Sequence, residues 1–170
     1  MNINIKEIIT AIILIISQLL IDQYVNLGQY ITIAIFPIII LSLPIKTNTP
    51  KLLFISFILG FIIDILSNNI IGISSAALVF ASLFRNSILS LILPEYNSES
   101  LKNPLSGNSK YIISSLLYIL IFYALYSSAY VLIEGMGVTS ILDNIIRITT
   151  YTLINAILAF FITLFAVNEH

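Results

Sequence analysis

The sequence contains no cysteine and very few charged residues. Without cysteine, the chain can form no disulfide bond, thiol nucleophile or thiolate metal site. Charged side chains make up only 9% of the residues, whereas an ordinary soluble domain has about 25%. The net charge of −1 provides no basic surface for nucleic acid. A water-soluble fold and nucleic-acid binding are therefore both disfavoured.

The residues that most enzymes need are also scarce. The one histidine is His170, which follows the last apolar run. A metal site lacks its usual ligands, and a membrane-embedded serine protease lacks its base. No glycine-rich phosphate loop is present. We therefore predict a protein that is not an enzyme and that holds no metal or cofactor.

Apolar residues, by contrast, make up 59% of the chain, and the mean hydropathy is +1.07. A helix needs about 20 apolar residues to cross a hydrocarbon core about 30 Å thick. The candidate runs are residues 8–21, 28–43, 52–66, 70–93, 111–133 and 145–167. They predict one all-α domain over residues 1–170, a polytopic membrane protein with six transmembrane helices. Pro37 predicts a kink in the second run.

Lysines occur on only one side of this arrangement. Loops on the cytoplasmic side of a membrane carry an excess of lysine and arginine. The loops 22–27, 67–69 and 134–144 contain neither residue type. The opposite side carries Lys6, Lys46, Lys51, Lys102 and Lys110. Both termini and the polar loop 94–110 are therefore expected in the cytoplasm.

Small and polar residues form a face on each of two neighbouring runs. They recur every three or four positions: Ser56, Gly60 and Asp64 on the third run, and Ser74, Ala77 and Ala81 on the fourth. This spacing places each set on one side of a helix. Because small residues let helices approach closely in lipid, we predict a tight antiparallel hairpin. The alternative is that these faces also receive a partner helix.

Three ionisable residues, Asp64, Arg85 and Arg147, lie within the apolar runs, where a charged side chain costs free energy. Counted at 1.5 Å per residue, Asp64 lies roughly 8 Å and Arg85 roughly 23 Å from the turn at 67–69. We therefore expect Arg85 to extend toward the cytoplasmic headgroups rather than to pair with Asp64. Arg147 is the better partner for Asp64 in depth. The competing expectation is that Arg147 pairs with Asp143, four residues earlier.

The last two runs contain aromatic and hydroxyl side chains. An aromatic face is formed by residues at a spacing of four: Tyr118, Phe122, Tyr126 and Tyr130. Helix packing and anchoring at the interface explain such a face more simply than ligand stacking does. The sixth run carries Thr149, Thr150, Thr152 and Asn155, which can bond to their own helix or to a neighbour.

The region around Asp64 resembles a known family signature. The sequence LGFIIDILS at residues 59–67, followed by IGISSA at residues 71–76, resembles the signature of the MreD family of bacterial rod-shape-determining membrane proteins. Gly60, Asp64, Ser67 and Gly72 match that pattern over about 40 residues. Chain length and the number of predicted spans are similar too.

This resemblance implies a scaffold without catalytic activity in the bacterial inner membrane. MreD-like proteins associate with MreC, a bitopic protein with a periplasmic domain. They belong to the cell-elongation machinery, with the MreB filament, the RodA glycosyltransferase and a class B penicillin-binding transpeptidase. The resemblance also implies a fold similar to the S components of energy-coupling-factor transporters. A partner helix would then dock in the lipid-facing groove, on the small face of the fourth run or the aromatic face of the fifth.

The alternative function is that of an S component, which binds a vitamin-like solute. An outer pocket could be lined by Asp64, Asn68, Asn69, Arg147 and the loop 134–144. S components resemble one another in an Ala-x-x-x-Ala docking motif on the first helix. Here Ala11 is followed by Ile15 at the second position of that motif, which argues against this function.

Overall fold

The computed structural model describes residues 5–25, 28, 31–45, 47–67, 70–92, 104–105, 112–135 and 139–167. Side chains are described from residue 8 to residue 164 of these ranges. The predicted loop 94–110, apart from residues 104–105, lies outside them, as do Asn68, Asn69 and His170. Of the five lysines used to orient the chain, Lys51 is the one whose side chain is described.

The described part of the chain is helical and contains no strand, which confirms the all-α prediction. The helices are α1 (Ile5–Tyr24), α2 (Pro37–Leu41), α3 (Thr49–Leu66), α4 (Ile73–Ile92), α5 (Ile112–Glu134) and α6 (Ile141–Val167). Four of them, α3 to α6, are long and apolar enough to cross a membrane, while the apolar part of α1, Ile8–Tyr24, is slightly shorter. These lengths indicate a multi-pass membrane protein.

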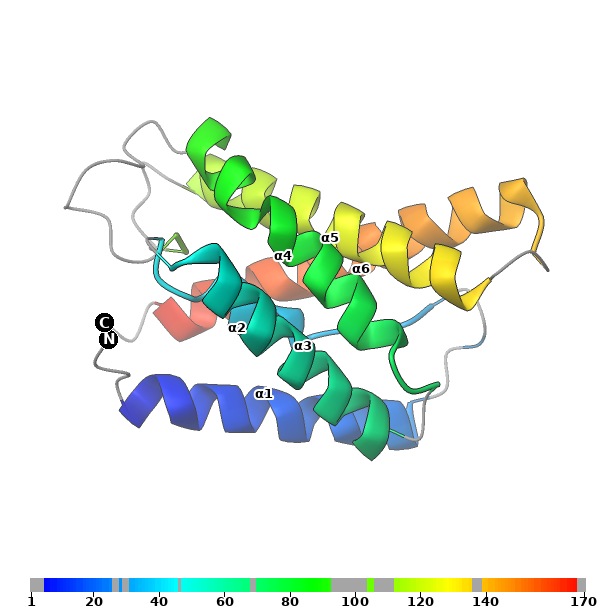
Figure 1. Ribbon diagram of the computed structural model, residues 1–170, viewed down its shortest axis with the longest axis horizontal. Helices are drawn as coiled ribbons and strands as arrows, with labels where there is room; N and C mark the ends of the chain where they lie inside the picture. Colours follow the sequence, from blue (N-terminus) through cyan, green and yellow to red (C-terminus); the bar gives the residue numbers. More distant parts are fainter. Residues whose placement is uncertain are drawn as a thin grey trace.

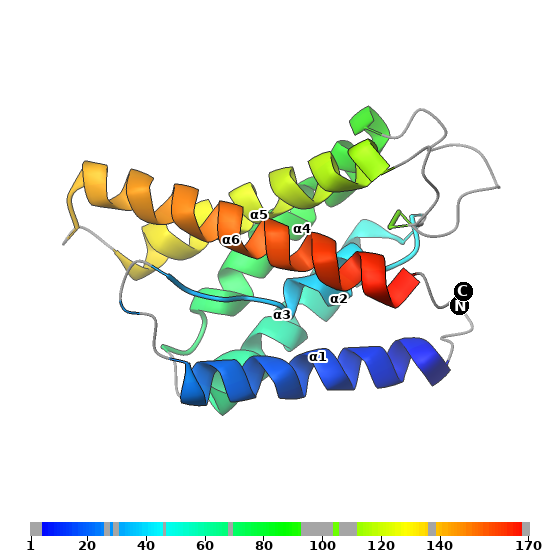
Figure 2. The same ribbon diagram turned by 180° about the vertical axis from the view of Figure 1, so that it is seen from behind.

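The long helices run back and forth along one axis (Figure 1). Helix α4 packs against α3 and α5, and α6 packs against α5. Helix α1 lies along one side of this group, and its described side chains are mostly exposed (Figure 2). The start of α1 and the end of α6 lie at the same end of the molecule.

The second apolar run does not form the predicted transmembrane helix over residues 28–43. Residues 31–35 are extended, and α2 has only five residues. Figure 2 shows the extended chain passing between α1 and α6 toward α2. Pro37 begins α2 instead of kinking a longer helix, because its missing N–H costs nothing at the first helical position.

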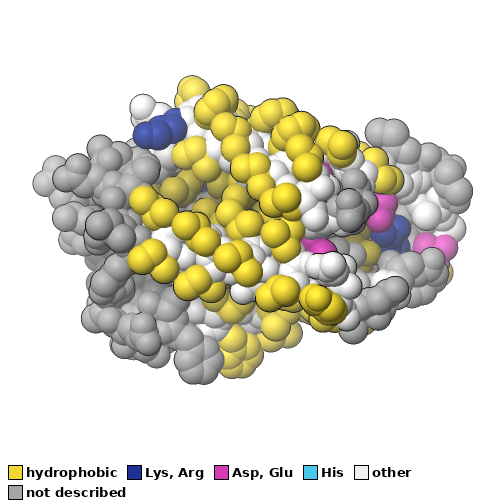
Figure 3. Space-filling view, turned by 90° about the horizontal axis from the view of Figure 1, so that it is seen from below, with side chains coloured by type: hydrophobic (Ala, Val, Ile, Leu, Met, Phe, Trp, Pro, Cys, Tyr) yellow, Lys and Arg dark blue, Asp and Glu magenta, His cyan; other side chains and the backbone are white. Residues whose placement is uncertain are grey.

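Apolar side chains cover the outside of the bundle as well as its core. Leu41, Leu52 and Leu78 are completely buried, whereas large residues such as Phe54 and Ile157 are more than half exposed. Figure 3 shows apolar side chains filling the centre of one face, with charged side chains toward its ends. This distribution suits a surface surrounded by lipid.

Candidate functional site in the polar interior

The most distinctive polar residue, Asp64, holds the start of α4. Its carboxylate is fully buried and accepts hydrogen bonds from the backbone N–H groups of Gly72 (2.9 Å), Ser74 (3.2 Å) and Ser75 (3.4 Å). The first N–H groups of a helix have no partner within the helix and carry a partial positive charge. The negative charge of Asp64 is therefore balanced by the N-terminus of α4.

Two glycines make this hairpin geometrically feasible. A Cβ on Gly60 would lie 2.6 Å from the backbone nitrogen of Ser75, so the two helices touch there without a side chain between them. Gly72 has a φ of +104°, a conformation that other residues rarely adopt. Further along the same face, the hydroxyls of Ser56 and Ser82 are 2.7 Å apart.

The other predicted residues of the hairpin lie in the same region. Ser74, Ala77 and Ala81 are buried in α4. The Ser67 hydroxyl, just after α3, donates to Oδ2 of Asp22 at 2.6 Å and so links α3 to α1. The small face of α4 is thus used within the bundle.

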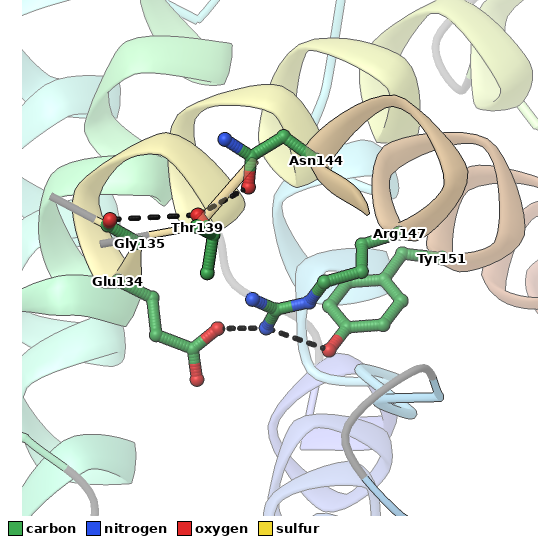
Figure 4. Close-up of polar contacts among 6 residues, drawn as sticks. All are labelled: Glu134, Gly135, Thr139, Asn144, Arg147 and Tyr151. Carbon is green, nitrogen blue, oxygen red and sulfur yellow. Dashed lines mark hydrogen bonds and ion pairs between the residues drawn. The ribbon is translucent and has the colours of Figure 1, made fainter. Parts of the chain in front are cut away.

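The predicted ion pair between Asp64 and Arg147 is not formed. Arg147 pairs instead with Glu134, the last residue of α5, and also donates to the Tyr151 hydroxyl at 3.1 Å (Figure 4). The guanidinium carbon lies 5.6 Å from the centre of the Tyr151 ring. The prediction was wrong because it considered depth alone. Asp64 already accepts hydrogen bonds from three backbone amides, and the Glu134 carboxylate lies within reach of Arg147.

The competing pair between Arg147 and Asp143 is absent as well. Asp143 accepts a hydrogen bond from the hydroxyl of Ser140 at 2.6 Å, and Ser140 accepts one from the backbone of Asp143 at 3.1 Å. This reciprocal arrangement caps the start of α6. In the same turn, the Thr139 hydroxyl donates to Oδ1 of Asn144 at 2.8 Å (Figure 4).

Arg85 is buried completely and does not extend to the headgroups, which corrects the prediction made for it. Its Nε donates to the Tyr118 hydroxyl at 3.0 Å, and its other nitrogens donate to the carbonyls of Leu43 and Pro44. The Tyr118 hydroxyl in turn donates to the carbonyl of Leu41 at 3.3 Å. These carbonyls lie at or just beyond the end of α2, where a partial negative charge favours a cation.

Two carboxamide side chains hold the extended residues 31–35. Gln18 of α1 accepts the N–H of Ile35 at 2.7 Å and donates to the carbonyl of Ile33 at 2.9 Å. On α6, Asn155 accepts the N–H of Ala34 at 2.7 Å and donates to the carbonyl of Thr32 at 2.8 Å. Each carboxamide thus pairs with the segment as a neighbouring strand would.

A third side chain completes this clamp. The Tyr123 hydroxyl of α5 donates to the carbonyl of Ala34 at 2.8 Å. Backbone polar groups need partners wherever lipid replaces water. The three helices therefore satisfy a segment that cannot satisfy itself.

Aromatic rings form a continuous column through the interior. The predicted face of Tyr118, Phe122, Tyr126 and Tyr130 is buried, and each ring lies 6.0–6.5 Å from another ring of the column. Tyr123 joins the face in the middle, and Tyr151 extends it toward Arg147. The column fills the space between helices and leaves these rings unavailable for ligand stacking or for an external helix.

One open cavity of about 570 Å³ lies at the start of α3. It is lined by Ile45, Thr47, Asn48, Thr49, Pro50, Lys51 and Asn86. Nδ2 of Asn86 bonds to the Thr47 carbonyl at 3.3 Å and to the Thr49 hydroxyl at 3.1 Å. None of the residues that line the cavity belongs to the family signature.

The sequence reasoning missed five residues of this site: Gln18, Asp22, Tyr123, Glu134 and Tyr151. Gln18 had a visible signal, since it is a polar side chain within an apolar run. Tyr123 and Tyr151 fall outside the four-residue spacing that defined the aromatic face. No group of three or more metal-ligating side chains occurs among the described residues.

Comparisons with known proteins give no assignment. No family model, curated protein or solved structure matches the chain.

Proposed function

We propose that the chain is a non-enzymatic membrane scaffold of the bacterial cell-elongation complex, resembling MreD. In this function it lies in the inner membrane with both termini in the cytoplasm. It binds an MreC-like bitopic protein and works with RodA and a class B penicillin-binding transpeptidase. The lipid-facing apolar surface and the four long apolar helices suit such a component.

The observation that carries the proposal is the common role of the residues in the resemblance. Gly60, Asp64, Ser67 and Gly72 all serve one local structure, the α3–α4 hairpin and its link to α1. This shared role in one hairpin supports the proposal, since the four residues of the resemblance have a common structural purpose. The signature therefore acts as a structural unit.

The interior favours a scaffold over a solute carrier. Gln18, Tyr123 and Asn155 have the polar groups expected of a solute site, but they are bonded to the chain's own extended segment. Arg85 is likewise bonded to backbone carbonyls. Asp64 and Arg147, both assigned to the outer pocket of a carrier, have separate partners.

The partner surface differs from the one that the sequence suggested. Because the small face of α4 and the aromatic face of α5 are buried, a partner helix has to dock on the outer, lipid-facing surface. Scaffolding then requires that the hairpin present its outer residues in a fixed arrangement.

The test is to purify the tagged chain from its native membrane in mild detergent and to identify what accompanies it by mass spectrometry. The proposal expects an MreC-like protein together with cell-wall synthases. Gly60→Leu, which wedges the hairpin apart, should reduce this recovery. Ile157→Leu, at an exposed position of α6 outside the hairpin, is the control. Recovery of a transporter T component with its ATPases, or of a bound vitamin, would contradict the proposal and support the S-component alternative.

The orientation needs a separate test. Reporter domains fused before α1 and after α6 should both be active on the cytoplasmic side. A reporter in the α5–α6 turn should be active on the opposite side. Activity of the two terminal fusions on different sides would refute the proposed orientation.

A further inference from the structure

The backbone N–H and C=O groups of the second apolar run could be paired within a helix or by side chains of other helices. The structure shows the second arrangement for residues 31–35. As a continuous helix, residues 28–43 would bond within themselves, apart from the Ile33 carbonyl, which would face Pro37 and its missing N–H. In the structure, residues 31–35 instead bond to side chains of α1, α5 and α6. We call residues 31–41, which comprise the extended segment and α2, the strap.

The partners of the strap come from distant parts of the sequence. The Tyr123 hydroxyl is 89 positions from the carbonyl it bonds, and the Asn155 carboxamide is 121 and 123 positions from its two backbone partners. These groups do not exist when the strap is synthesised. An extended strap in lipid would then leave its N–H and C=O groups unpaired, which is costly.

We propose that the strap is a conformational unit that closes into the bundle only when α6 presents Asn155. Before closing, its backbone groups are paired within a helix, and closing exchanges those bonds for the carboxamides of Gln18 and Asn155. Arg85 secures the far end, because its guanidinium binds the carbonyls just beyond α2. The strap thus has two discrete arrangements, of which the closed one depends on a single residue of α6.

The closed strap is packed against the bundle, so its release would break identifiable contacts. Ala34, Ile35, Phe36 and Ile40 are all buried, and the Phe36 ring lies 5.9 Å from the Tyr126 ring, nearly perpendicular to it. Opening would expose the aromatic column while α3, α4, α5 and α6 kept their mutual contacts. Opening of the strap can therefore be measured separately from unfolding of the bundle.

The experiment measures distances between spin labels by pulsed electron resonance in lipid nanodiscs. The chain has no cysteine of its own, so two introduced cysteines are the sole labelling sites. Labels at the half-buried Ile31 and the exposed Ile157 follow the strap relative to α6, and labels at the exposed residues Phe54 and Leu83 follow the α3–α4 hairpin. Asn155→Leu should raise the ratio of open to closed strap about tenfold or more, because the two hydrogen bonds between α6 and the extended segment are lost. The hairpin distance should not change.

The control is Thr163→Val, which removes a buried hydroxyl of α6 that bonds only within its own helix. It should leave both distances unchanged. Gln18→Leu, which breaks the clamp from the side of α1, should open the strap as Asn155→Leu does. A strap distance unaffected by Asn155→Leu would overturn the proposal. Loss of the hairpin distance in the same proportion would overturn it too, since strap and bundle would then be one unit.

Discussion

Replacement of Asp64 by alanine should destabilise the bundle strongly and locally. The change removes three backbone hydrogen bonds that the fully buried carboxylate accepts at the start of α4. Loss of an N-terminal cap costs about 0.5–2 kcal/mol, and loss of a partly buried charge at a helix end costs up to about 2 kcal/mol. We expect a decrease in the free energy of unfolding of about 3 kcal/mol.

Replacement of Asp64 by asparagine removes the charge but keeps a side chain of nearly the same shape. Asp64→Asn keeps one acceptor oxygen, but its amide donors face the N–H groups of Gly72 and Ser75. The expected decrease is about 1.5 kcal/mol, since the cap is partly kept and the charge is lost. Asp143→Ala is the matched control, a carboxylate near the start of α6 whose hydrogen bonds are exposed. It should cost less than about 1 kcal/mol.

The assay is reversible unfolding in mixed micelles, followed by circular dichroism. Hydrogen exchange of the first turn of α4 shows where the loss occurs. If Asp64→Ala were no more destabilising than Asp143→Ala, the carboxylate would not be holding α4. The same conclusion would follow if exchange increased evenly over all the helices.

Three further changes test other contacts. Gly60→Leu should cost more than about 3 kcal/mol in the same unfolding assay, because the added side chain meets the backbone of α4, whereas Ala76→Leu should be nearly neutral. Arg85→Leu should cost about 3 kcal/mol, since it leaves two partly buried carbonyls and the buried Tyr118 hydroxyl without their donor, and a loss below about 1 kcal/mol would refute this role. Charge reversal at Glu134 or Arg147 alone should cost about 1–2 kcal/mol, and reversal of both should recover most of that loss; a double variant no better than the singles would refute the pair.

The sequence predicted the hairpin because its determinants are local. Gly60, Asp64 and Gly72 lie within thirteen positions of one another, and helical spacing alone brings the first two onto one face. The partner of Asp64 was still missed. A carboxylate within an apolar run suggests a cation, whereas the unpaired amides of a helix start do not stand out in a sequence.

The second apolar run could not have been predicted by the same reasoning. Its composition is that of a helix, and its extended form depends on Asn155 and Tyr123, more than 85 positions away. Asn155 was noted as a hydrogen-bonding residue, but nothing local indicates the backbone that it binds. Arg85 failed for the same reason, because its acceptors are main-chain carbonyls, which every residue possesses.

The buried charges at positions 64 and 85 are independent of each other, which has an evolutionary consequence. Each is stabilised by uncharged groups, mainly peptide N–H or C=O groups, so loss of either one leaves no opposite charge stranded in lipid. Glu134 and Arg147, by contrast, neutralise each other. Among descendants of this sequence, we expect substitutions at 134 and 147 to arise together, and those at 64 and 85 to arise singly.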